Sequence, residues 1–424
     1  MTALIIAVFI IGYLVIVLEH PLHLNKAAAA LITGVLCWTI YILNAREPHI
    51  VNEHLVGHLG SIAEILFFLL GAMTIVELID THDGFEVITS RIKTTNKRKL
   101  MWLLCGITFF LSAILDNLTT AIVMVSLVKK LVKDKQLSLL YSGLIVVAAN
   151  SGGAWSPIGD VTTTMLWISG QVSSLSLIKH LILPSMVSLA VPLIVAGRQL
   201  HGRLELASPD SFPDKPLALE RDRNRVFFTG LIILLFVPVF KTLTHLPPYM
   251  GMLLGLGVIW VVTELIHKGK EEEVKSFYSV MNAIRKVDTP SILFFLGILI
   301  SVAALESLGV LHQAAAMLDQ YIGNKSMIVT VIGLLSAVVD NVPLVAASMG
   351  MYTMDHFPPD DAFWHLLAFC AGTGGSILII GSAAGVAAMG IEKIEFFWYI
   401  KKIAWLALLG YVSGILVFLA LQTS

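Results

Sequence analysis

Residues 112–117 read Ser-Ala-Ile-Leu-Asp-Asn, and residues 336–341 repeat them as Ser-Ala-Val-Val-Asp-Asn. In both places the Asp-Asn pair stands in the middle of an apolar stretch. The two copies share further blocks in the same order: apolar segments ending at Gly71 and Gly297, then glycine pairs at residues 152–153 and 374–375. Recurrence of several blocks in one order indicates an internal duplication, which is common in membrane transporters.

The composition identifies lipid as the main solvent of this chain. Of its 424 residues 57% are hydrophobic and only 13% are charged, a balance that a soluble protein does not tolerate. Its net charge is -1, and we expect no nucleic acid partner. The three cysteines lie in apolar runs at unrelated spacings, which argues against a disulfide framework and a metal cluster. We expect no cofactor and no enzymatic activity.

Apolar runs of about 20 residues, the length that crosses a bilayer as a helix, recur along the whole chain. The first run lacks the flanks of a removable signal peptide, so we expect it to be a span. The expected fold is an all-α polytopic membrane protein with about ten transmembrane helices. They are placed at 2–18, 27–43, 61–79, 138–168, 177–197, 226–242, 249–266, 289–306, 362–390 and 402–421.

The positions of the basic residues predict the orientation in the membrane. Most of the 28 Lys and Arg residues fall in alternate loops, and the positive-inside rule places those loops in the cytoplasm and both termini outside. The stretch 100–132 has basic clusters at both ends, so we expect a re-entrant helical hairpin from the cytoplasm. The stretch 326–352 has the same layout and is followed by acidic residues instead of basic ones. We therefore expect a second re-entrant hairpin that enters the membrane from the outer side. Polar hairpin tips at this depth must be buried in protein or line water.

Each half of the chain then has five spans and one hairpin. An odd number of crossings makes the two copies antiparallel, which is the inverted-repeat plan of many secondary transporters. The predicted division is a first repeat over 1–200, a cytoplasmic linker over 201–225 and a second repeat over 226–424. Glycine-rich segments at 150–160 and 372–382 predict a discontinuous helix in each repeat.

Helix breaks expose backbone groups at membrane depth, where they can replace the hydration shell of a small ion. Asp116, Asp160 and Asp340 lie in the breaks and hairpin tips, and these segments contain no Lys or Arg, which favours a cation. Each buried carboxylate costs about 2.5–3.5 kcal/mol on insertion scales, so packing is a poor explanation for three of them. A carboxylate partly withdrawn from water binds either a proton or a metal ion, and this competition is sufficient for antiport.

The same residues also have structural interpretations. Asp340, and the neighbouring Asn117 and Asn341, could simply cap the helices that start beside them. Hydroxyl side chains in membrane helices often bond to their own backbone. Both interpretations stay open for the candidate site residues, which are Asp116, Asn117, Thr119, Thr120, Asn150, Ser151, Asp160, Thr162, Thr163, Ser336, Asp340, Asn341, Thr373, Ser376 and Ser382.

The segments 112–120 and 150–163 closely resemble motifs of the NhaD-type sodium/proton antiporters of the ion transporter superfamily. The resemblance implies a homodimer in a bacterial inner membrane, surrounded by lipid, that exports Na⁺ or Li⁺ in exchange for H⁺. It also implies a scaffold domain and a transport domain that moves like an elevator. The Na⁺ ligands carried over from the family are Asp116, Asn117, Asn150, Asp160 and Thr162. Since the second copy has Gly372 and Ser382 where the first has Asn150 and Asp160, we expect the charge to be concentrated in the first copy.

Two alternatives belong to the same superfamily. A sodium-coupled dicarboxylate transporter would bind its anion with Ser-Asn-Thr tips, whereas the tips here read Asp-Asn-Leu-Thr and Asp-Asn-Val-Pro. Acidic tips would repel such a substrate. An arsenite exporter is the other alternative.

Overall fold

The computed structural model describes residues 1–89, 92, 94–204 and 219–422. Within these ranges the regular elements are helices, and Asn96 and Arg203 form an isolated antiparallel bridge. The helices before the linker are α1 (Thr2–Val17), α2 (Glu19–Leu22), α3 (Lys26–Asn44), α4 (Pro48–Thr81), α5 (Glu86–Thr89), α6 (Lys97–Leu115), α7 (Asn117–Leu131), α8 (Lys135–Gly153), α9 (Val161–Ile168) and α10 (Ser174–Gly197).

Most of the predicted linker, residues 205–218, lies outside the described residues. The helices after it are α11 (Glu220–Thr244), α12 (Pro248–His267), α13 (Glu272–Phe277), α14 (Val280–Lys286), α15 (Thr289–Ser307), α16 (Val310–Tyr321), α17 (Lys325–Leu335), α18 (Asn341–Met351), α19 (Ala362–Gly374), α20 (Ala383–Glu392), α21 (Phe396–Tyr399), the π-helical turn η1 (Ile400–Ala404) and α22 (Trp405–Gln422).

Every predicted span coincides with a helix or with a pair of helices, and the all-helical multi-pass fold is confirmed. Among the described residues, eight helices are long and apolar enough to cross a membrane. They are α3, α4, α6, α10, α11, α12, α15 and the continuous run from α21 through η1 to α22. The total of ten crossings stays a prediction, because α1 has only 16 residues and two predicted spans are interrupted.

The interruptions occur where the sequence places glycine and acidic residues. One separates α8 from α9 over residues 154–160, and the other separates α19 from α20 over residues 375–382. In the same way Asp116 separates α6 from α7, and residues 336–340 separate α17 from α18. Many helices restart at an Asp, Asn or Ser whose side chain accepts a backbone N–H of the first turn, a strong local start signal.

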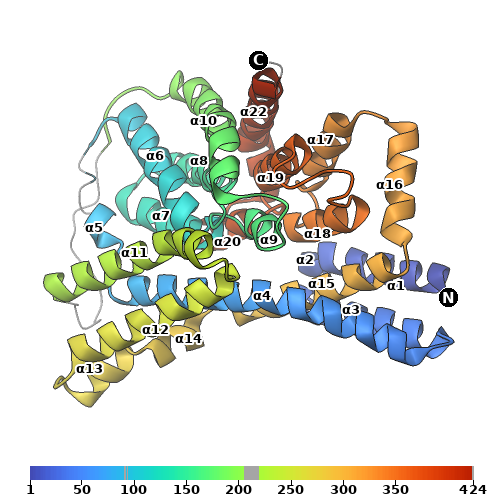
Figure 1. Cartoon of the computed structure of the whole chain (residues 1–424). Helices are drawn as coiled ribbons and strands as arrows, with labels where there is room; N and C mark the ends of the chain where they lie inside the picture. The colour runs from blue at the N-terminus through green and yellow to red at the C-terminus, as the bar shows by residue number, and fades with distance from the viewer. Residues whose placement is uncertain (90–91, 93, 205–218, 423–424) are drawn as a thin grey trace.

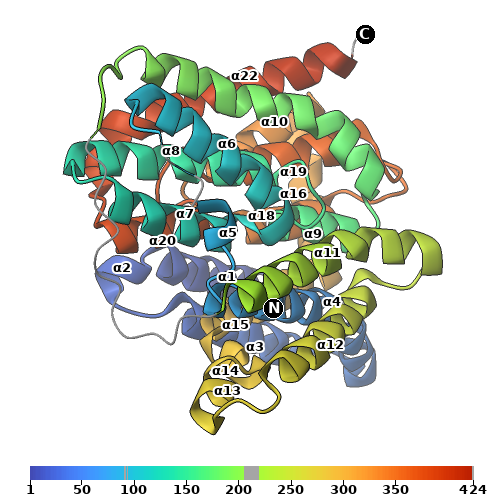
Figure 2. The same cartoon turned by 90° about the vertical axis from the view of Figure 1, so that its left-hand side faces the viewer.

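The helices form two layers, seen edge-on along the bottom and the top of Figure 1 and again in Figure 2. We call them layer A and layer B. Layer A contains α1, α3, α4, α11, α12 and α15, which pack on one another. Layer B contains α6 to α10, α17 to α20 and α22. Each layer draws helices from both halves of the chain, so segments far apart in the sequence meet within it.

Two features of the fold were not predicted. Helix α16 is amphipathic and connects α15 of layer A to α17 of layer B, as Figure 1 shows. Helix α4 has 34 residues and begins at Pro48, well before the predicted start at residue 61. Polar residues in its first turns interrupt the apolar pattern, and a hydropathy window therefore begins too late.

Candidate functional site

Four half-helices of layer B begin around one point. Helices α7, α9, α18 and α20 start at Asp116, Asp160, Asp340 and Ser382, and each of these side chains accepts a backbone N–H of its own first turn. A helix N-terminus carries a partial positive charge of about +0.5. The converging N-termini therefore stabilise carboxylates at a depth where a carboxylate would otherwise be costly.

The three carboxylates line one cavity, which lies between the layers. Layer A contributes mostly apolar side chains to its wall, including Phe68 and Phe295. The cavity offers about 50 Å³ to water-sized molecules, whereas a single water needs about 10–15 Å³. A few waters or a partly hydrated small ion would fit beside the carboxylates.

Asp160 is the centre of the polar contacts. Its side chain is only 2% exposed, and both carboxylate oxygens accept hydrogen bonds. Asn117 Nδ2 donates to Oδ2 over 3.0 Å, and Asn341 Nδ2 donates to the same oxygen over 3.3 Å. The N–H of Thr162 donates to Oδ1 over 3.0 Å. All the donors that the described residues bring to this carboxylate are neutral, so no cation cancels its charge.

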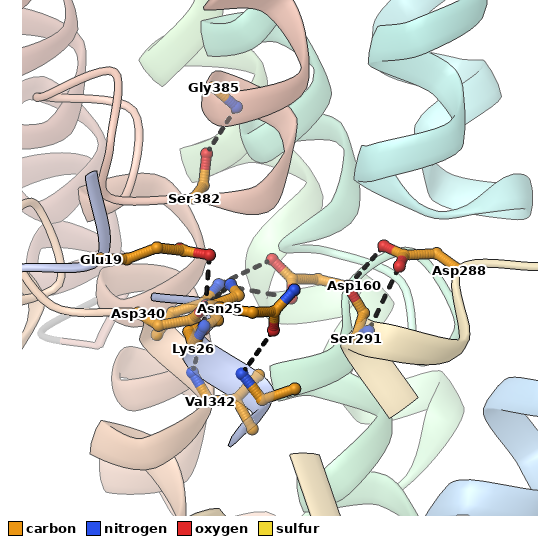
Figure 3. Close-up of polar contacts among 12 residues, drawn as sticks. Glu19, Asn25, Lys26, Asp160, Asp288, Ser291, Asp340, Val342, Ser382 and Gly385 are labelled. Atoms are coloured by element: carbon orange, nitrogen blue, oxygen red, sulfur yellow. Dashed lines mark hydrogen bonds and ion pairs between the residues drawn. The ribbon is translucent and has the colours of Figure 1, made fainter. Parts of the chain in front are cut away.

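A third amide, that of Asn150, extends this network to the other broken helix. Asn150 Oδ1 accepts from Asn117 Nδ2 over 3.1 Å, and Asn150 Nδ2 donates to Ser382 Oγ over 2.9 Å. Figure 3 shows Ser382 at the start of its helix, where it also accepts the N–H of Gly385. One hydrogen-bonded chain thus joins both Asp-Asn tips to both helix breaks.

Asp116 faces the same cavity and bonds to its own turn. Thr119 donates twice, from its N–H to Oδ1 over 2.7 Å and from its hydroxyl to Oδ2 over 2.9 Å. The backbone of Asp116 has φ = 100°, a region that residues other than glycine rarely adopt and that stores strain. The Thr119 contacts hold the carboxylate in place despite that strain.

Replacing Thr119 by Val is expected to lower the stability of the protein. The change removes the hydroxyl that donates to Asp116 and leaves a half-buried carboxylate oxygen without that donor. A hydrogen bond to a charged group is worth about 1.5–3 kcal/mol. Thermal unfolding of the purified protein in detergent measures the loss. Thr119→Ser keeps the hydroxyl and is the matched control, and equal melting temperatures for both variants would contradict this role.

Asp340 has a charged partner that the sequence did not indicate. Lys26 Nζ lies 3.1 Å from Asp340 Oδ2, and both side chains line the cavity. Lys26 is the first residue of α3, more than 300 positions away in the chain. One feature of the sequence could have drawn attention to Lys26. It lies in the first turn of a helix, where a basic residue is unfavourable because it opposes the helix dipole.

Most of the remaining candidate residues do not line the cavity, and their hydroxyl groups donate to backbone carbonyl oxygens. Thr163, Thr373 and Ser376 donate their hydroxyls to backbone oxygens of their own helix or its cap, as does Ser336, which also reaches Ala371. Ser151 lies 3.4 Å from Ser188. The hydroxyls of Thr120 and Thr162 are buried, and no described residue bonds to them.

The structure brings four of the five predicted Na⁺ ligands into direct contact. Asn117, Asn150, Asp160 and Thr162 form one hydrogen-bonded group, and Asp116 lines the same cavity apart from it. No group of three or more His, Cys, Asp or Glu side chains that could hold a metal ion occurs in the described part of the chain. Apart from Asp116 and Asp160, the predicted ligands Asn117, Asn150 and Thr162 are neutral.

A multi-pass helical fold with carboxylates lining a cavity between two layers is the architecture of a membrane transporter. The comparisons agree with this class. The model of the family described as citrate transporter, CitMHS, matches residues 6–368. Sodium/proton antiporter 1 of Arabidopsis thaliana is 51% identical over 98% of this chain and 71% of its own length. The Na(+)/H(+) antiporter NhaD of Alkalimonas amylolytica is 31% identical over 98% of this chain and 90% of its own length.

The chain therefore belongs to the CitMHS family of transporters and, through these relatives, to the NhaD-type sodium/proton antiporters of the ion transporter superfamily. The named relatives are transporters, not enzymes, as predicted. Among solved structures, the YdaH transporter of Alcanivorax borkumensis has a similar fold, with a TM-score of 0.58 at 13% identity over 89% of each chain.

Proposed function

We propose that this protein exchanges Na⁺, and also Li⁺, for H⁺ across a membrane, exporting sodium as protons enter. The observation that carries the proposal is Asp160, a buried carboxylate held only by neutral donors in a cavity between two helix layers. A buried charge without a counter-ion is costly, and either a proton or a metal cation removes that cost. The two ions therefore compete for the same oxygens.

Amide groups around Asp160 suit this competition. Asn117 and Asn341 donate their N–H groups to the carboxylate in the present arrangement. Rotation of an amide about its terminal bond would present its oxygen instead, and carboxylate and amide oxygens are ligands for hard cations. The site can thus hold its charge when empty and supply oxygens when a cation enters.

The transport cycle proposed here moves layer B relative to layer A. The carboxylates lie on layer B, while the opposing wall belongs to layer A and is mostly apolar, with Lys26 as its one charged side chain among the described residues. Sliding of the polar site along this mostly apolar wall would expose it to each side in turn. We further propose that the two halves are inverted repeats with hairpins at 100–132 and 326–352, and that both termini lie outside.

The oligomeric state of the protein and the kind of membrane that contains it are expected from the family resemblance alone. A homodimer embedded in lipid stays a prediction, and so does a bacterial inner membrane. The relatives named above come from a plant and from a bacterium, so the family is not restricted to bacteria.

A vesicle assay tests the proposed function. Inverted membrane vesicles that contain the protein are acidified inside, and a pH-sensitive dye reports collapse of the gradient when salts are added. We expect Na⁺ and Li⁺ to collapse the gradient, and citrate or succinate added together with Na⁺ to leave the response to Na⁺ unchanged. Vesicles with the same amount of the Asp160→Asn variant are the control. A gradient that does not respond to Na⁺ would contradict sodium/proton antiport, and coupled uptake of citrate would favour an anion transporter.

A further inference from the structure

Lys26 and Asp340 form an ion pair inside the cavity. Their side chains are 25% and 15% exposed, and the ammonium lies 3.1 Å from Asp340 Oδ2. The same ammonium lies 4.4 Å from the centre of the Phe294 ring, whose face attracts a cation. Figure 3 shows the pair close to Asp160. Lys26 is the sole basic side chain among the described residues that line this cavity.

The position of Lys26 is unfavourable for α3 itself. It is the first residue of the helix, directly after Asn25, which caps the helix by accepting the N–H of Ala27. The partial positive charge at a helix start repels an ammonium. Local helix stability therefore gives no reason for Lys26. The Glu19 carboxylate accepts the backbone N–H of Lys26 over 3.2 Å, and the ammonium itself contacts Asp340 and the Phe294 ring, which offset the repulsion.

The three carboxylates of the cavity are not equivalent in charge. Asp116 and Asp160 accept hydrogen bonds only from neutral groups. Asp340 accepts the N–H of Val342 at one oxygen and the Lys26 ammonium at the other. The ammonium cancels the charge of Asp340, so the uncompensated negative charge lies with Asp116 and Asp160.

The pair also joins the two layers. Lys26 belongs to α3 of layer A, and Asp340 caps α18 of layer B. We propose that Lys26 is a tethered cation that neutralises Asp340 in place of a transported ion, so that Na⁺ and H⁺ compete only for Asp116 and Asp160. This role rests on the proposed antiport function. It makes Lys26 a charge-balancing residue that touches no transported ion.

A cycle of charge-changing variants tests this role through the KM for Na⁺ at alkaline pH. Lys26→Gln leaves an unpaired carboxylate in the cavity and lowers the KM. Asp340→Asn leaves an unpaired ammonium that repels Na⁺ and raises the KM. Each shift is about tenfold, the size expected for one uncompensated charge near a partly buried ion. The double variant Lys26→Gln/Asp340→Asn has a neutral pair, and its KM returns to within about twofold of the wild type, because the two charge effects cancel.

The chain provides a matched control outside the cavity. Lys325 pairs with Asp319 and lies 4.7 Å from the centre of the Tyr352 ring, so it repeats the surroundings of Lys26. Lys325→Gln is expected to leave the KM for Na⁺ unchanged. Lys26→Arg keeps the charge and should stay close to the wild type. Melting temperatures of all purified variants separate folding defects from changes in KM.

The outcomes distinguish this role from the proposed function. Opposite shifts in the single variants with recovery in the double variant support the tethered cation. Shifts in the same direction, or no shifts, in vesicles whose wild type responds to Na⁺ would overturn this role and leave antiport intact. A wild type without any Na⁺ response would overturn antiport, and the role of Lys26 with it.

Discussion

We expect Asp160→Asn to abolish Na⁺-dependent proton exchange while the protein still folds and reaches the membrane. A unit charge about 4 Å from an ion contributes about 4 kcal/mol at an effective dielectric constant of about 20. Loss of that charge is expected to weaken Na⁺ binding by about 1,000-fold, and it also removes the proton-binding group. The dye assay in vesicles, titrated with Na⁺, measures the effect.

Folding should survive this change because Asn is as good a helix cap as Asp. The Asn oxygen can still accept the N–H of Thr162, and the amides of Asn117 and Asn341 can turn over to face its amide nitrogen. Asp361 caps α19 with the same geometry outside the cavity, so Asp361→Asn is the matched control and should retain exchange. Normal exchange by Asp160→Asn at equal expression would refute the central role of this carboxylate.

Gly374→Ala is expected to destabilise the protein more than other small changes in its helices. Gly374 ends α19 where that helix crosses α17, and a Cβ atom there would lie 2.0 Å from the carbonyl oxygen of Gly333. Gly152 of α8 meets α6 in the same way, 2.2 Å from the carbonyl oxygen of Phe109. Backbone atoms cannot move aside like a flexible side chain, so the helices must separate.

Such overpacking costs about 1–3 kcal/mol, and more where two backbones are in contact. The apparent melting temperature of the purified protein, measured by size-exclusion chromatography after heating, reports the loss. Gly390→Ala is the matched control, because a Cβ at Gly390 meets nothing within 4 Å. Alanine in an open helical position stabilises by up to about 1 kcal/mol. Equal melting temperatures for the two variants would show that the close crossing of α17 and α19 does not contribute to the stability of the protein.

Much of the fold could be predicted because a membrane leaves few options for an apolar chain. The predicted span 249–266 corresponds to α12 (Pro248–His267), and 289–306 corresponds to α15 (Thr289–Ser307). In lipid every backbone group must be paired within its own segment, so apolar runs become helices. Helix α16 was not predicted because it is amphipathic. One of its faces is polar, so its hydrophobic pattern does not resemble that of a membrane span.

Part of the candidate site could be predicted from the local sequence around each residue. Asp116, Asp160 and Asp340 were found because acidic residues in apolar stretches have few explanations, and all three line the cavity. Asp340 caps α18, as its structural interpretation expects, and its carboxylate contacts the Lys26 ammonium, a partner that neither interpretation named. Thr373 was one of the candidate site residues, and its hydroxyl donates to the carbonyl oxygen of Phe369 in its own helix.

The sequence by itself determined where the helices run, where they break and which residues cap the restarted segments, because these features depend on neighbours within a few positions. Only the tertiary structure decided which charges meet. Lys26 and Asp340 are distant in the chain, and their contact depends on how α3 of layer A lies against α18 of layer B. Electrostatic energy depends on distance in space, so the balance between one ammonium and three carboxylates exists only after the two layers have packed.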